Sequence, residues 1–124
     1  MGSMKILCID DAQVVRNAIV HEVKKLGFDC DEAVDAFEGK QMLQSGQYNL
    51  IFLDVNMPGK TGIEMLSELN EEKIQYAPVV MLTTEASQEM KSLGKQLGVK
   101  AWVVKPLNND MVKLIIDKMA LKNE

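Results

Sequence analysis

The sequence has few of the residues on which metal and nucleophile sites most often depend. Its 124 residues include two cysteines, Cys8 and Cys30, and a single histidine, His21. Zinc sites take closely spaced Cys and His ligands, and Ser/His/Asp or Cys/His systems need a histidine beside the nucleophile. The two cysteines lack such spacing, and His21 falls in the middle of an expected helix. We therefore expect neither kind of site, and we expect the cysteines to be a buried, reduced pair.

Long apolar runs and an excess of positive charge are also absent. No run approaches the roughly 20 apolar residues that a membrane-spanning helix needs. Fourteen Lys and Arg against eighteen Asp and Glu give a net charge of −4, which argues against nucleic acid as the main partner. Met1-Gly2-Ser3 carries no secretion signal and has the composition of a cloning remnant. We therefore expect one domain over residues 4–124, in the cytoplasm and without membrane contact.

Five short segments predict β-strands. Four are almost continuously apolar, and each is closed by a polar residue: Lys5–Ile9, Asn49–Leu53, Val79–Leu82 and Ala101–Val104. Such runs are typical of parallel strands that are covered on both faces. A fifth segment, Cys30–Val34, is interrupted by Asp31 and Glu32, so we expect it at an edge of the sheet.

Helical periods alternate with these strands. Apolar residues recur at spacings of three and four in the stretches 14–26, 35–43, 63–69, 90–97 and 112–119. Gly27 and Gly98 are expected to end two of these helices, and Asp35 with Glu38 resembles a capping box. Five βα units predict an α/β fold with an open, doubly wound parallel sheet. In such sheets, functional residues gather beyond the carboxyl ends of the strands.

Polar side chains follow the ends of four predicted strands. They are Asp10, Asp11, Asp54, Thr83 and Lys105. The fold would bring all five to one edge, where three carboxylates repel one another and need a cation. A set of oxygen ligands favours Mg²⁺ over Zn²⁺ or Cu²⁺. Acids, a cation, a lysine and a hydroxyl suit a phosphoryl group, and a carboxylate nucleophile forming an acyl phosphate is the simplest assignment.

Four motifs, in this order, resemble those of a known family. They are Ile9-Asp10-Asp11, Leu53-Asp54-Val55-Asn56-Met57-Pro58-Gly59, Leu82-Thr83-Thr84-Glu85 and Val104-Lys105-Pro106. Together they resemble the receiver domain of bacterial two-component response regulators, in particular single-domain chemotaxis regulators of the CheY type. The resemblance covers Lys5 to Met119. It implies a flavodoxin-like (βα)5 sheet with strand order 2-1-3-4-5 and a cis Lys105-Pro106 bond.

The resemblance also implies a role for each matching residue at the acidic edge. Asp54 matches the phosphoacceptor. Asp10, Asp11 and Asp54, with the backbone carbonyl of Asn56, match the groups that hold Mg²⁺. Lys105 matches the lysine that pairs with the phosphoryl group.

Further residues match positions that respond to phosphorylation. Thr83 matches the hydroxyl that moves onto the phosphoryl group, and Trp102 stands at the aromatic switch position, where Tyr or Phe is commoner. Asn56 and Glu85 match positions that tune dephosphorylation. Thr84 replaces a small Ala or Gly, which would restrict access to the phosphoryl group.

The implied protein is a monomeric phosphoacceptor rather than a turnover enzyme. A CheA-like histidine kinase would donate the phosphoryl group to Asp54, and the domain would then switch a partner-binding surface. That surface is expected on the fourth helix, fifth strand and fifth helix, which Thr83 and Trp102 border. In the CheY type, the target is the flagellar motor switch. A phosphate sink, or a stand-alone regulator of another output, would use the same chemistry and remains open.

Two other classes of protein share part of the pattern. Asp-nucleophile phosphohydrolases of the haloacid dehalogenase type use Mg²⁺, but they have a DxD motif and a cap insertion, whereas Asp10 and Asp11 are adjacent. A flavodoxin-like flavin binder would need a Ser/Thr/Gly-rich phosphate loop after the first strand, where this chain is acidic. Single residues also have structural explanations: Asp10-Asp11 would suit a helix cap, and Trp102 would suit core packing.

Overall fold

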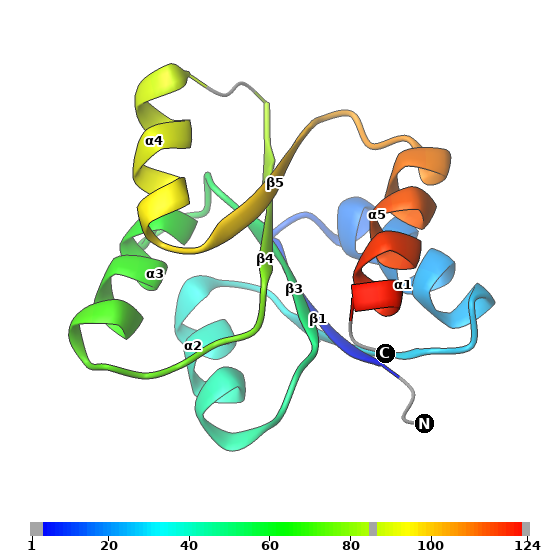
Figure 1. Ribbon diagram of the computed structural model, residues 1–124, viewed down its shortest axis with the longest axis horizontal. Coiled ribbons are helices and arrows are strands. Elements are labelled where there is room, and N and C mark those ends of the chain that lie inside the picture. Colours follow the sequence, from blue (N-terminus) through cyan, green and yellow to red (C-terminus); the bar gives the residue numbers. More distant parts are fainter. Residues whose placement is uncertain (1–3, 85–86, 123–124) are drawn as a thin grey trace.

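Strands and helices alternate along the chain, as the sequence predicts (Figure 1). The computed structural model describes residues 4–84 and 87–122. Its elements are β1 (Lys5–Ile9), α1 (Gln13–Lys25), β2 (Asp29–Ala33), α2 (Ala36–Ser45), β3 (Leu50–Asp54), α3 (Gly62–Glu71), β4 (Val79–Thr83), α4 (Gln88–Gln96), β5 (Val99–Val104) and α5 (Asn109–Lys122).

The strands form one parallel sheet in the order β2-β1-β3-β4-β5. Helices α1 and α5 cover one face, and α2, α3 and α4 cover the other (Figure 1). This confirms the doubly wound, flavodoxin-like fold. Because all five strands run in the same direction, their carboxyl ends meet at one edge of the sheet, where the predicted site residues lie.

Burial agrees with the prediction for three of the four apolar runs. Strands β3 and β4 are buried along their whole length, and β1 is buried after its first residue. Alternate residues face the two helix layers: Leu7 and Ile9 pack on the α2–α3 side, and Ile6 and Cys8 pack on the α1–α5 side. The central strands therefore form a rigid base for the residues at their ends.

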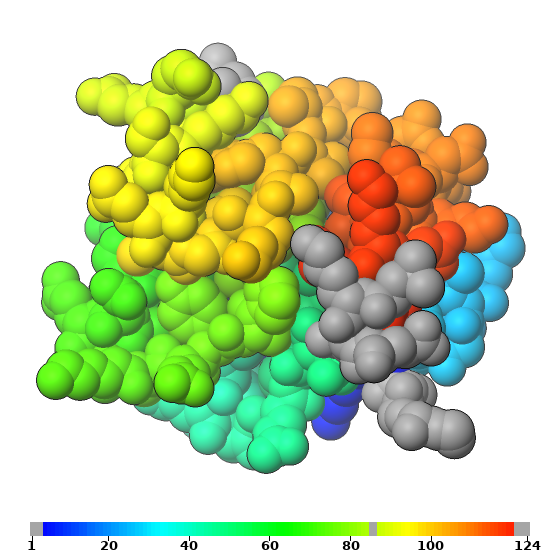
Figure 2. Space-filling model, in the orientation of Figure 1, coloured from blue at the N-terminus to red at the C-terminus, as the bar shows by residue number. Residues whose placement is uncertain are grey.

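The prediction that Ala101–Val104 is covered on both faces holds only in part: Trp102 packs on one face of the sheet and Val103 is buried on the other, but the coverage is incomplete. Strand β5 lies at an edge of the sheet and pairs only with β4, so its side chains are less covered. Trp102 is half-buried, and Val104 is 55% exposed. The other edge is β2, as predicted. Figure 2 shows α4, β5 and α5 side by side on one face of the molecule.

The predicted helix ends are close to those observed. Asp35 accepts a hydrogen bond from the backbone N–H of Glu38 at 2.8 Å, and the Glu38 side chain accepts one from the N–H of Val34 at 2.9 Å. This is a variant of the capping box. Gly27 and Gly98 follow α1 and α4 with φ of +88° and +84°, the left-handed region that favours glycine.

The two cysteines lie on neighbouring strands, β1 and β2, and pack on the same face of the sheet. Cys8 is buried and Cys30 is half-buried, and the structure has both as free cysteines, so the expected burial holds fully only for Cys8. His21 is exposed on α1. Among the described helices, none is long and apolar enough to cross a membrane.

Candidate functional site

Three carboxylates meet at the carboxyl edge of the sheet. Asp10 and Asp11 follow β1, and Asp54 is the last residue of β3. One carboxylate oxygen from each lies within 4.8 Å of the other two. Asp10 and Asp54 are buried, with 0% and 2% of their surface exposed, whereas Asp11 faces solvent. The structure therefore brings together the acidic residues that the sequence selects.

Lys105 supplies positive charge to this cluster. It follows β5, and its Nζ lies 3.0 Å from Oδ2 of Asp10 and 3.2 Å from Oδ1 of Asp54. The Lys105-Pro106 bond is cis, as the resemblance implied. The backbone N–H of Lys105 donates to the carbonyl of Thr83 at 2.7 Å, which joins the ends of β5 and β4. Thr83 itself is buried, one residue beyond the β4 partner of Asp54.

The charges in the cluster shift its proton equilibria. Burial and the negative charge of Asp10 raise the pKa of Asp54 to about 6, although Lys105 opposes the rise. Burial lowers the pKa of Lys105, but the hydrogen bond to Asp10 and the charges of both acids outweigh this, so its pKa is raised overall. Lys105 is therefore a cation at neutral pH, and Asp54 is mostly a carboxylate.

The donor atoms suit a hard divalent cation. Oδ1 of Asp10 accepts the N–H of Ala12 at 2.9 Å, and Oδ1 of Asp54 accepts the N–H of Asn56 at 3.3 Å. Within the described part of the chain, the buried Oδ2 of Asp10 is contacted by the Lys105 ammonium and accepts no other hydrogen bond. A buried carboxylate oxygen with spare acceptor capacity, beside two more carboxylates, fits the oxygen ligands that Mg²⁺ prefers.

Two residues that the sequence did not single out hold the acids in place. Nη1 of Arg16 donates to the backbone carbonyl of Asp10 at 2.7 Å, and its Nε pairs with Glu32 on β2 at 3.1 Å. A Cβ atom on Gly62 would overlap the backbone carbonyl of Asp54, so only glycine fits at the start of α3. Two features of the sequence could have pointed to these residues. One is an arginine on the first helix, close after the acidic pair, and the other is a glycine at a helical position where a better helix former would be expected.

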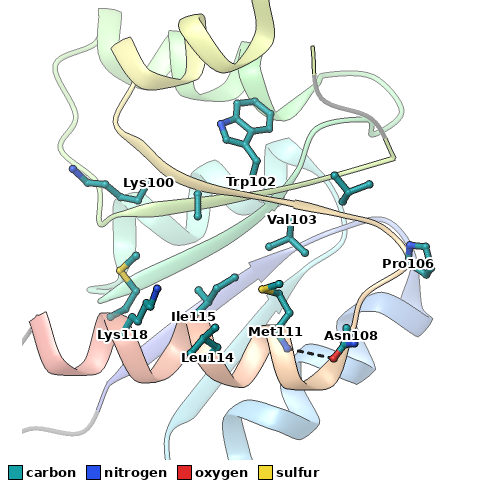
Figure 3. Close-up of a pocket in the computed structure, with 12 residues that line it drawn as sticks. Lys100, Trp102, Val103, Pro106, Asn108, Met111, Leu114, Ile115 and Lys118 are labelled. Atoms are coloured by element: carbon teal, nitrogen blue, oxygen red, sulfur yellow. Dashed lines mark hydrogen bonds between the residues drawn. The ribbon is translucent and has the colours of Figure 1, made fainter. Parts of the chain in front are cut away.

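The remaining predicted residues lie around the cluster. Ala12, not Asp10 or Asp11, is the residue that precedes α1, so the helix-cap explanation of the acidic pair is not supported. Asn56 is exposed just beyond β3, and Thr84 is exposed beyond β4. Trp102 pairs with Met81 of β4, and its ring points from β5 towards α4 (Figure 3). Glu85 lies outside the described residues.

Comparison with known proteins places these features in one family. The family model described as "Response regulator receiver domain" matches residues 6–117. The chain is 37% identical over 118 residues to the chemotaxis protein CheY of Pseudomonas aeruginosa, covering 94% of this chain and 95% of that protein. It is 34% identical to CheY-3 of Vibrio cholerae, over 94% of this chain and 92% of that protein.

Solved structures agree with these relatives. The structure of the Vibrio cholerae chemotaxis protein CheY4 matches with a TM-score of 0.85 at 31% identity, over 95% of this chain and 99% of that one. The receiver domain of the Francisella response regulator 1452 matches with a TM-score of 0.87 at 25% identity, over 98% of this chain and 100% of that one.

Proposed function

The chain belongs to the response regulator receiver domain family, and we propose that it is a single-domain regulator that accepts a phosphoryl group on Asp54. The observation that carries this proposal is the cluster itself: a buried Asp54 beside Asp10 and Asp11, with Lys105 3.2 Å from its carboxylate. The domain extends over residues 4–124 and acts as a monomer in the cytoplasm.

The proposed chemistry needs only the groups at this edge. An oxygen of Asp54 attacks the phosphorus of a phosphohistidine on a CheA-like kinase, so an O–P bond forms while the N–P bond breaks. The imidazole nitrogen leaves with the bonding electrons and takes a proton from solvent. Because the pKa of Asp54 is about 6, most molecules present the carboxylate at neutral pH.

Each neighbouring group has a part in binding the phosphoryl group. Lys105 already contacts Asp54 and pairs with a phosphoryl oxygen. Asp10, Asp11, Asp54 and the carbonyl of Asn56 hold Mg²⁺, which supplies charge to offset the carboxylates and the phosphoryl oxygens. The hydroxyl of Thr83 donates to the phosphoryl group.

Two more positions tune the lifetime of the product. Asn56, which is exposed just beyond β3, and Glu85 adjust the rate of dephosphorylation. The reaction leaves the protein modified rather than releasing a product at each turn, so the chain is a phosphoacceptor and not a turnover enzyme.

The signal leaves through the face formed by α4, β5 and α5. A groove of about 930 Å³ lies between β5 and α5, and its lining includes Val103, Met111, Leu114 and Ile115 (Figure 3). Met111 and Leu114 are about half exposed, at 47% and 50%, beside the exposed Val104, and grouped apolar side chains of this kind are typical of protein interaction sites. Similarity to chemotaxis proteins favours the flagellar motor switch as the target.

The charges on this face favour an acidic partner. Lys91, Lys95 and Lys100 are exposed on α4 and β5. A phosphate sink would use Asp54 in the same way but would have no partner that binds the phosphorylated form more tightly. A regulator of another output would have such a partner outside the motor.

The proposal is tested by treating the protein with acetyl phosphate and Mg²⁺ and measuring its intact mass. The wild type should gain one phosphoryl group, and Asp54→Asn or removal of Mg²⁺ with EDTA should prevent the gain. Asp117→Asn, which changes an exposed carboxylate on α5, should behave as the wild type. Equal labelling of Asp54→Asn would overturn the assignment.

A further inference from the structure

Helix α4 packs on the sheet with few large side chains: Met90, and Leu97 directly after the helix, contact the core. Of the nine residues that the structure describes in α4, Gly94 is the one that is buried. Leu93 is 43% exposed, and Met90 is half-buried. A helix is normally anchored by large side chains on its inner face. Here the inner face contains a residue that has no side chain.

The indole of Trp102 fills the space that a side chain at Gly94 would occupy. A Cβ atom on Gly94 would lie 2.5 Å from Cζ2 of Trp102 and 3.3 Å from Cβ of Val99, and the first distance is too short for any carbon contact. Figure 3 shows the ring extending from β5 towards α4, on the opposite side of the strand from Val103 and the groove. The helix and the strand therefore meet at the contact between glycine and indole.

The two residues are matched in size. Glycine is among the least favourable residues inside a helix, so its presence at position 94 needs a compensating contact. Cζ2 belongs to the benzo ring of the indole, which extends beyond the reach of a Tyr or Phe ring on that side. The large indole on β5 thus packs closely against the helix at the position where α4 has no side chain.

We propose that the Gly94–Trp102 contact anchors α4 to β5, and that Gly94 is a positioning residue that keeps the indole against the helix. Because α4 and β5 belong to the face proposed above as the output surface, this contact sets the arrangement of that surface in the resting protein. The link to signalling rests on the proposed function, whereas the anchor itself does not.

The first test uses Trp102, the only tryptophan, as its own reporter. Gly94→Ala should displace the indole towards solvent, which shifts its emission to longer wavelength and increases quenching by acrylamide. Ser92→Ala is the matched control, since Ser92 is exposed on the same helix and should leave emission unchanged. Unchanged emission and quenching in a folded Gly94→Ala protein would overturn the proposal.

The second test separates the size match from a general effect on the helix. Gly94→Ala should lower Tm in the wild-type background, because the added methyl group overlaps the indole. In a Trp102→Tyr background the same change should leave Tm unchanged or raise it, because alanine favours the helix and the overlapping atom is gone. An equal Tm change in both backgrounds would contradict the size match.

Neither test requires phosphorylation. If the wild type were not phosphorylated, the fluorescence and Tm results would still decide whether the anchor exists. If the anchor were absent, phosphorylation of Asp54 would be unaffected. The two proposals therefore fail by different measurements.

Discussion

Replacing Asp54 with Asn should stabilise the metal-free protein. Its carboxyl is buried beside Asp10, and its pKa rises from 3.8 to about 6 despite the attraction of Lys105. That difference corresponds to about 3 kcal/mol of folding free energy that the ionised form costs. An amide has nearly the same shape and no charge, so Asp54→Asn should recover up to this amount well above pH 6.

The pH dependence gives the sign of the effect. A raised carboxyl pKa means that the folded protein binds this proton more tightly than the unfolded chain. This group therefore adds stability to the wild type as pH falls from about 6 towards 3.8, and the full cost of ionisation is present above about 6. The advantage of Asp54→Asn should be largest at neutral pH and should shrink on acidification.

Urea unfolding in EDTA at a series of pH values measures this difference. The free energies of unfolding of the wild type and of Asp54→Asn should converge as pH falls, while Asp117→Asn, an exposed change, should stay parallel to the wild type. A variant that is less stable than the wild type at neutral pH, or a difference that is independent of pH, would refute the reasoning.

Three further predictions concern the groups around Asp54. Mg²⁺ should raise the Tm of the wild type by relieving repulsion among the carboxylates, and Asp11→Asn should weaken this rise; a flat Mg²⁺ titration would count against the site. Lys105→Arg should keep the resting fold but abolish the change in Trp102 emission that beryllofluoride with Mg²⁺ should cause. The planar guanidinium of arginine does not fit the place of the Lys105 ammonium, which lies 3.0 Å from Asp10. A normal change in emission would show that this geometry is unimportant. Arg16→Gln should lower the free energy of unfolding by about 2 kcal/mol, since it removes a charge-assisted bond to Asp10, and should weaken Mg²⁺ binding in a calorimetric titration; unchanged Mg²⁺ affinity would limit Arg16 to a structural role.

Periodicity predicted the fold because the central strands are buried on both faces. Leu50–Asp54 and Val79–Thr83 carry apolar side chains at nearly every position, and this pattern requires a covered parallel sheet. The pattern overstated the burial of β5, because this edge strand pairs only with β4 and its side chains, although they pack on both faces of the sheet, stay partly exposed. A local pattern does not show which strands lie side by side, so the strand order was predicted from the family resemblance.

The acidic cluster could be selected from the sequence because its members each close a strand. The sequence could not predict that these acids differ in their exposure to solvent. Asp10 continues the pairing of β1 with β2 through its N–H to Ala33 and is buried, whereas the adjacent Asp11 faces solvent. The contacts of Arg16 with Asp10, and of Gly94 with Trp102, join separate elements and depend on packing that spacing does not reveal.

The most direct test of the central claim is to locate the modified residue. After treatment with acetyl phosphate and Mg²⁺, reduction with borohydride converts an acyl phosphate on aspartate into homoserine, which peptide mass spectrometry can place in the sequence. We expect homoserine at position 54 in the wild type and none in Asp54→Asn. Homoserine at position 10 or 11, or a phosphoryl group on Thr83 or His21 that borohydride does not remove, would contradict the assignment of Asp54 as the acceptor.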